Sequence, residues 1–173
     1  MPYADGIFPA WRKETNYFIN AKPQMGSLNV GAWRILELSI RKEAIALMQT
    51  LEVYTGAFDL IRHLNEDLQV IEVHKFWYKI VKGTDRWIDM RGNAGIVFVA
   101  CNDADSSCNV ELANICQNIC KATGWLVTAP TAKEKIICCS LDDFYKSGKV
   151  AKIPETEGIT KIMGSLQSGA LGA

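Results

Sequence analysis

The sequence predicts an α+β domain, and three patterns support this prediction. Apolar residues recur every three or four positions from about Asn29 to Glu66, which is helical spacing. β-Branched and aromatic residues dominate between Val70 and Met90, and residues 95–101 are apolar on both faces, as in a central strand. We therefore expect a long helix or helical hairpin, an antiparallel sheet of about five strands covered by one amphipathic helix, and extended arms at both ends.

Length and composition indicate one folded domain. At 173 residues the chain suits a single core, and we assign residues 27–150 to it, with arms at 1–26 and 151–173. The 19 basic and 19 acidic side chains balance, which argues against a polybasic nucleic-acid module. The N-terminus shows no secretory pattern, so an intracellular, cytoplasmic or virion location without a membrane partner is expected.

The first predicted element is helical over residues 29–66. Asn29 is a plausible N-cap, and Gly56, preceded by β-branched Thr55, is expected to kink the segment or divide it into two helices. The apolar stripe consists of Trp33, Leu36, Ile40, Ala44, Leu47, Leu51, Tyr54, Phe58, Ile61 and Leu64.

A hairpin is predicted over residues 70–90. Gly83, in Lys82-Gly83-Thr84-Asp85, suits the first loop position of a type II′ turn. This turn would place Ile80 opposite Trp87. The register gives the other three pairs as Tyr78 with Asp89, Trp77 with Met90, and Phe76 with Arg91.

The second half of the chain alternates between helical and strand patterns. Residues 109–123 form an amphipathic stripe that ends at Gly124, a typical C′ glycine. Strands are expected near 125–129 and 135–141. The C-terminal arm is expected to carry a short amphipathic helix with the apolar residues Ile159, Ile162, Met163 and Leu166.

The six cysteines are expected to be reduced thiols, because neither the chain length nor the N-terminus suggests a small secreted disulfide scaffold. Cys116 and Cys120 lie one helical turn apart, a spacing that could present two thiolates to a metal. Cys138 and Cys139 point to opposite faces of a strand. Since no CxxC motif is present, core packing is favoured and no metal site is assigned.

Residues 102–106 resemble the start of a calcium loop but lack its later glycine and glutamate, so a turn is the better interpretation. No phosphate loop, GxGxxG or HExxH motif is present, and neither His63 nor His74 lies in a recognisable catalytic arrangement. The sequence therefore predicts no catalytic residue, no cofactor and no enzymatic activity.

The hairpin offers a candidate nucleic-acid surface, because basic and aromatic side chains interleave in it, a mixture that stacks bases and neutralises phosphates. The candidate contacts are Lys75, Trp77, Lys79, Arg86 and Arg91. The alternative is that one face packs on the long helix while the lysines lie over apolar surface.

The arms are rich in apolar side chains, although disordered segments are normally poor in aromatic residues. The expected oligomer contacts are Tyr3, Phe8, Trp11, Tyr17, Phe18, Ile159, Ile162, Met163 and Leu166. The first hypothesis is a non-catalytic structural subunit that self-assembles into a homo-oligomer through its arms, such as a viral coat or filament protein. An RNA-binding or regulatory accessory protein is the second hypothesis, and a small enzyme without a familiar motif is the third.

Overall fold

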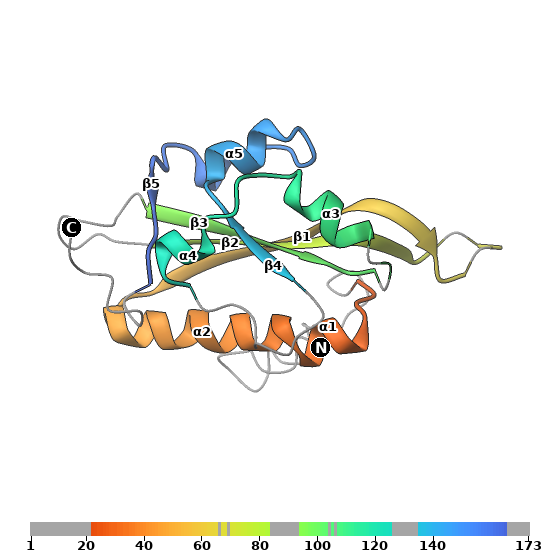
Figure 1. Cartoon of the computed structure of the whole chain (residues 1–173), viewed down its shortest axis with the longest axis horizontal. Coiled ribbons are helices and arrows are strands. Elements are labelled where there is room, and N and C mark those ends of the chain that lie inside the picture. Colours follow the sequence, from red (N-terminus) through yellow and green to blue (C-terminus); the bar gives the residue numbers. More distant parts are fainter. Residues whose placement is uncertain are drawn as a thin grey trace.

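The computed structural model of the chain describes residues 22–65, 67–68, 70–83, 94–103, 105, 107–125 and 135–165. A mostly antiparallel sheet lies between helix α2 on one face and helices α3 and α5 on the other (Figure 1). The elements in chain order are α1 (Gly26–Val30), α2 (Ala32–Leu47), β1 (Leu51–His63), β2 (Glu72–Gly83), β3 (Ala94–Cys101), α3 (Ser107–Ala113), α4 (Cys120–Thr123), β4 (Ile136–Cys139), α5 (Leu141–Lys146), the 3-10 turn η3 (Pro154–Thr156) and β5 (Lys161–Ile162). The predicted α+β class is confirmed.

Helix α2 follows the predicted apolar stripe over its own length. Trp33, Leu36 and Ile40 are buried against the sheet. Met48 then adopts a left-handed conformation with φ of 50° and ends the helix. The prediction of a helix or helical hairpin up to residue 66 is wrong, because the chain continues as strand β1. Asn29 lies inside α1, whose N-cap is Met25, so its predicted capping role is also wrong.

Strand β1 is the edge strand of the sheet in the order β1-β2-β3-β4. Its β-branched Val53 and Thr55 suit an extended backbone. Asp59 has φ of 57°, and the register with β2 shifts between Leu60 and Arg62, which identifies a bulge. The spacing that looked helical therefore arises in a strand whose alternation the bulge interrupts.

Strand β2 lies between β1 and β3, so the predicted hairpin at residues 82–85 is wrong. Ile80 pairs with Tyr54 on one side and with Val97 on the other, which leaves no place for Trp87. Gly83 is the last residue of the strand, and residues 84–93 lie outside the described part. All eight residues of β3 are buried, as its apolar sequence predicts.

The C-terminal segment forms strand β5 at Lys161–Ile162, parallel to the start of β3, instead of the predicted amphipathic helix. Met163 is 1% exposed and its carbonyl accepts a hydrogen bond of 2.9 Å from the indole of Trp125. These contacts tie the segment to the sheet. Residues 1–21 of the N-terminal arm, residues 126–129 of the strand predicted near 125–129, and Leu166 lie outside the described residues.

All six cysteines form disulfides, so the prediction of reduced thiols is wrong. The pairs are Cys101–Cys108, Cys116–Cys139 and Cys120–Cys138. Cys138 packs in the core on the α2 side, whereas Cys139 packs in the core on the α3 and α5 side. The predicted alternation of these two cysteines is therefore confirmed, and it places the Cys120–Cys138 disulfide on the α2 face and the Cys116–Cys139 disulfide on the opposite face.

The predicted helix 109–123 is broken into α3 and α4 because the chain between them follows the edge of β4. The amide of Ile119 donates to the carbonyl of Cys138 at 2.9 Å. The side-chain oxygen of Asn118 accepts hydrogen bonds from the amides of Cys138 and Cys120 at 3.2 and 3.1 Å. These strand-edge contacts replace the intrahelical bonds of a continuous helix.

Two apolar cores stabilise the sheet, one on each face. The core between α2 and the sheet includes Leu28, Trp33, Leu36, Ile40, Val81, Ile96, Phe98, Trp125 and Met163. The core between the sheet and helices α3 and α5 includes Phe58, Phe76, Tyr78, Ile80, Val97, Val99, Leu112, Ile137 and Phe144. No helix in the described ranges is long and apolar enough to cross a membrane.

A first prediction concerns Gly56 in β1. A Cβ atom added there would overlap Cζ and the hydroxyl oxygen of Tyr78, which is 8% exposed. We expect Gly56→Ala to lower the free energy of unfolding by about 1–3 kcal/mol, the usual cost of overpacking. Urea denaturation would measure it. Gly26→Ala is the control, since a Cβ at Gly26 meets nothing within 4 Å. A Gly56→Ala protein as stable as the wild type would contradict the prediction.

Candidate functional site

A groove of 550 Å³ lies between helix α2 and strand β1. It is lined by Glu37, Ile40, Arg41 and Ala44 of α2, Gln49 and Thr50 of the connection, Leu51, Val53 and Thr55 of β1, and Lys79 of β2. Glu37, Arg41 and Ala44 lie four and three residues apart, so they share one edge of the helix beside its buried stripe. Charged, amide and hydroxyl groups therefore meet an apolar wall in one concave site.

Lys79 is the most constrained charged group of the groove. The side chain is 10% exposed, and its Nζ lies 3.3 Å from Glu37 Oε1. The same nitrogen donates to Thr55 Oγ1 at 3.2 Å and lies 4.9 Å from the ring centre of Trp33. A carboxylate, a hydroxyl and an aromatic face thus hold this ammonium group in place, as expected for a cation with little contact to water.

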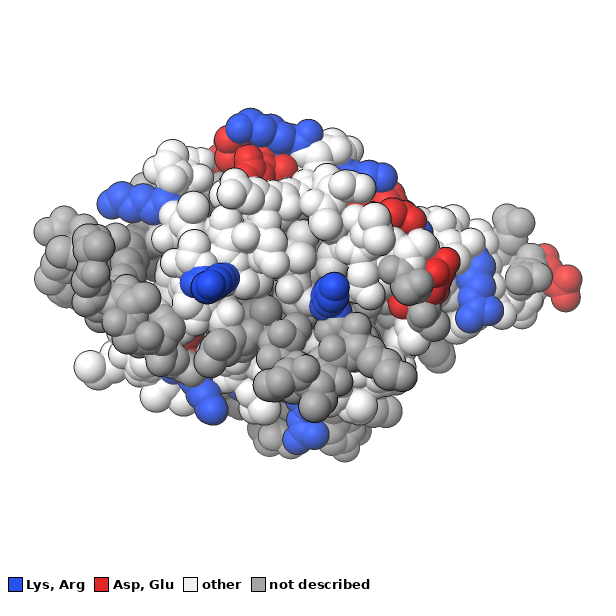
Figure 2. Space-filling model, viewed as in Figure 1, with Lys and Arg blue, Asp and Glu red and all other residues white. Residues whose placement is uncertain are grey.

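Arg41 and Glu37 supply the other charges. Arg41 is exposed and Glu37 is half-buried. With Lys79 the groove carries two cationic side chains and one carboxylate, so its formal charge is one positive. On the face shown in Figure 2, lysine and arginine side chains are spread over separate places rather than gathered in one patch.

The predicted nucleic-acid contacts lie in different surroundings. Lys79 lines the groove, whereas Trp77 packs edge-on against Trp33 with ring centres 6.0 Å apart. Lys75 forms an ion pair of 2.6 Å with Glu111 of α3. Arg86 and Arg91 lie outside the described residues. The structure therefore brings one of the five predicted residues to the groove and places two others in contacts within the fold.

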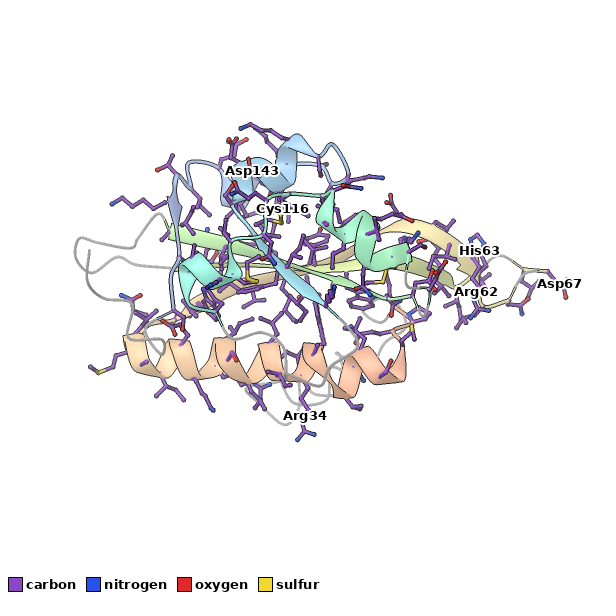
Figure 3. All side chains as sticks on the ribbon, in the orientation of Figure 1. Arg34, Arg62, His63, Asp67, Cys116 and Asp143 are labelled. Atoms are coloured by element: carbon purple, nitrogen blue, oxygen red, sulfur yellow. A yellow bond between two sulfur atoms is a disulfide. The ribbon has the colours of Figure 1, made fainter. Side chains whose placement is uncertain are left out.

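The two histidines lie away from the groove. His63 ends β1 near the protruding tip of the β1–β2 ribbon, where Figure 3 labels it beside Arg62. His74 Nε2 lies 3.4 Å from Glu72 Oε2, and burial lowers the pKa of the imidazole. The hydrogen bond from Lys22 at 3.0 Å lowers the pKa of Glu72. In the described part of the chain, no three His, Cys, Asp or Glu side chains form a group that could hold a metal.

The predicted oligomer contacts that can be located contribute to this chain's own fold. Met163 is buried in the core between α2 and the sheet, and Ile159 packs against the core between the sheet and helices α3 and α5. Ile162 is 49% exposed. Leu166 and the five aromatic residues of the N-terminal arm lie outside the described residues.

Sequence reasoning missed Glu37 and Arg41. Their spacing of four residues was visible, and both positions flank the stripe formed by Trp33, Leu36 and Ile40. A pair of opposite charges at this spacing is usually a solvated helix face, so the signal by itself is weak. Only the packing of β1 beside α2 turns that face into the wall of a groove.

Comparison with known proteins identifies the family. The family model described as DNA/RNA non-specific endonuclease matches residues 1–134. The chain is 26% identical over 163 residues to a salivary endonuclease of Lutzomyia longipalpis, which covers 86% of this chain and 37% of that protein. It is 28% identical over 131 residues to the salivary protein Tsal1 of Glossina morsitans morsitans, which covers 69% of this chain and 31% of that protein. The chain thus spans about a third of these relatives' length, and no solved structure matches it.

These matches correct several expectations. The expected intracellular location is wrong, because both relatives are named as salivary proteins and disulfides persist in oxidising compartments. The expected nucleic-acid partner agrees with the family description, whereas the expected homo-oligomer has no such support. The expectations of a non-catalytic, self-assembling coat or filament subunit and of a chain without enzymatic activity are contradicted by the family match. The family model covers more than half of the chain, and the chain therefore belongs to the DNA/RNA non-specific endonuclease family.

Proposed function

We propose that the chain is part of a secreted nuclease that hydrolyses the phosphodiester bonds of DNA and RNA, and that the groove between α2 and β1 binds the backbone of the substrate. The observation that supports this most is the family match over residues 1–134, which includes every residue that lines the groove. The two cationic side chains of the groove fit an anionic backbone.

Phosphodiester hydrolysis places additional negative charge on the oxygens around phosphorus as the transition state forms. Fixed cations beside those oxygens stabilise that charge, and groups held in place before the reaction do so most effectively. Lys79 has this property, since Glu37 and Thr55 hold its Nζ at 3.3 and 3.2 Å. Its role is to present a fixed positive charge at the floor of the groove.

Arg41 contributes a planar guanidinium group at the groove's exposed side. This group can donate two parallel hydrogen bonds to the oxygens of one phosphate. Phosphate contacts position a nucleic acid without reading its bases. A groove that binds mainly through phosphate suits the cleavage of DNA and RNA without sequence specificity.

The test is cleavage of plasmid DNA and of single-stranded RNA by the purified full chain in a buffer that contains Mg²⁺. We expect Arg41→Ala to lower kcat/KM at least about tenfold on both substrates, because a charge-assisted phosphate contact contributes about 1.5–3 kcal/mol. Arg34→Ala is the matched control. Arg34 lies on the same helix, does not line the groove, and points away from the sheet in Figure 3.

Two results would contradict the proposal. One is a wild-type chain that cleaves neither substrate. The other is equal activity of the Arg41→Ala and Arg34→Ala proteins, which would remove the groove from the reaction. Circular dichroism of both variants would establish that they are folded.

A further inference from the structure

We infer that the outer face of α2 binds the surface of an anionic lipid bilayer. This face consists of Arg34, Leu38, Lys42, Ile45 and Met48, which lie three or four residues apart along α2 and at its C-cap. Figure 3 labels Arg34, whose side chain points away from the sheet. None of the five residues lines the groove, so the inference goes beyond the proposed nuclease function and does not depend on it.

The middle of the outer face is an apolar ridge. Leu38 is 45% exposed, Ile45 is 76% exposed and Met48 is 92% exposed. Leu38 and Ile45 are seven residues apart, which is about two helical turns, so one lies above the other. The core does not need them, because α2 buries a separate apolar stripe on its opposite side. Single exposed apolar residues are ordinary, whereas an aligned set on one helix face indicates a contact surface.

The charges beside this ridge are all positive. The exposed charged residues of α2 are Arg34, Arg41 and Lys42. The helix also contains two carboxylates, and neither lies on the outer face. Glu43 is fully buried, and Glu37 forms its ion pair with the lysine at the floor of the groove. Since the chain as a whole has no net charge, the positive charge of this face is a local feature.

An apolar ridge between cations matches the two layers of an anionic bilayer surface. In helices that lie in a membrane interface, cationic side chains reach the headgroups while apolar side chains enter the boundary with the acyl chains. A nucleic-acid backbone would pair with the cations but leave the apolar ridge in water. A second copy of the chain would bring two positive faces together, and like charges repel. The outer face therefore fits anionic lipid better than either of these partners.

Sedimentation with lipid vesicles tests the inference. The probes are vesicles of equal parts phosphatidylserine and phosphatidylcholine, and vesicles of phosphatidylcholine alone. The full chain is used in EDTA, so that divalent cations do not bridge protein and lipid. We expect the chain to bind the mixed vesicles, and to bind phosphatidylcholine alone at least about tenfold more weakly, because the cations then lose their attraction to the surface.

Two double variants separate the contributions of charge and apolar surface. Arg34→Gln with Lys42→Gln removes two cations, and Leu38→Gln with Ile45→Gln removes the centre of the ridge. Glutamine favours helix, so α2 is retained in both proteins. Near an anionic surface each lysine or arginine strengthens binding about fivefold. We expect each double variant to bind the mixed vesicles at least about tenfold more weakly than the wild type.

Matched controls make the same changes away from α2. Lys121→Gln with Lys152→Gln removes two exposed cations elsewhere on the chain. Leu64→Gln with Leu68→Gln removes two exposed apolar side chains at the tip of the β1–β2 ribbon. We expect both controls to change vesicle binding by less than about twofold, because charges beyond a Debye length of the bilayer are screened. Circular dichroism would establish that all four proteins are folded.

Several results would overturn the inference. One is equal binding of the wild type to both kinds of vesicle, and another is an equal loss in the α2 variants and their controls. A loss in the charge variant alone would indicate adsorption without insertion of the ridge. A dimer in light scattering that Leu38→Gln with Ile45→Gln abolishes would assign the face to a second copy.

Cleavage of plasmid DNA without lipid separates this inference from the proposed function. A chain that cleaves DNA but does not bind the mixed vesicles would overturn only the lipid inference. A chain that binds these vesicles through the outer face but cleaves neither DNA nor RNA would overturn only the proposed nuclease function.

Discussion

Removal of the disulfide between Cys120 and Cys138 is expected to lower the free energy of unfolding by about 3 kcal/mol. The two residues are 18 positions apart, and a cross-link that closes a loop of this length restricts the unfolded chain by about that amount. Cys138 is fully buried and Cys120 is 9% exposed, so Cys120→Ala with Cys138→Ala avoids placing a hydroxyl group in the core. The loss is large because total stability is about 5–15 kcal/mol for most domains.

The other two disulfides close loops of different length, so their expected contributions to stability can be compared with that of Cys120–Cys138. Alanine at both Cys116 and Cys139, which are 23 positions apart, should cost a similar amount. The Cys101–Cys108 disulfide closes a loop of 7 positions and should cost less, about 2.5 kcal/mol. Guanidinium denaturation of the three double variants would measure the order. If loss of the short-loop disulfide had the largest effect, chain restriction would not be the main contribution of these bonds.

The cysteines show what the sequence could and could not predict. Alternation along a strand is a property of the backbone, and it correctly placed Cys138 and Cys139 on opposite faces. Their oxidation depended on a segment distant in sequence, residues 116–120, that follows the edge of β4 and brings one cysteine to each face. A periodic pattern read as one continuous helix could not reveal this path.

The sheet was predicted in part for similar reasons. Strand β3 was predictable because both of its faces are buried, so nearly every residue is apolar. Strand β1 was not, because apolar residues between Leu51 and Leu64 recur at intervals that also fit a helix. Its bulge between Leu60 and Arg62 interrupts the alternation that would have identified it. The β-branched residues Val53 and Thr55 were the local signals for a strand.

The candidate site lay beyond sequence reasoning because its charged groups come from separate elements. Arg41 and Glu37 are on α2, whereas Lys79 is on the second strand of the sheet. No short motif joins them, and each has an ordinary structural interpretation when taken alone. Lys79 was singled out for its basic and aromatic neighbours. The groove exists because β1 turns back beside α2, and that turn fell within the segment predicted to be helical.

Phe144→Ala is expected to lower the free energy of unfolding by about 3–5 kcal/mol. Phe144 is fully buried on α5, and its ring centre lies 5.3 Å from that of Tyr78 and 6.2 Å from that of Phe58. These rings come from α5, β2 and β1, so the side chain fixes the helix to the two strands. Its removal takes away buried apolar area and leaves a cavity between rigid rings that can close only in part.

Two control variants, Phe144→Leu and Lys146→Ala, are compared with Phe144→Ala. Phe144→Leu keeps most of the apolar volume and should cost clearly less than Phe144→Ala, because the cavity is smaller. Lys146 lies on the same helix and forms an exposed ion pair with Asp142. Lys146→Ala should therefore change the free energy of unfolding by less than about 0.5 kcal/mol. Thermal or urea denaturation measures all three. If Phe144→Ala cost no more than Lys146→Ala, α5 would not be held to the sheet by this core, and the ring contacts with Phe58 and Tyr78 would not contribute to its packing.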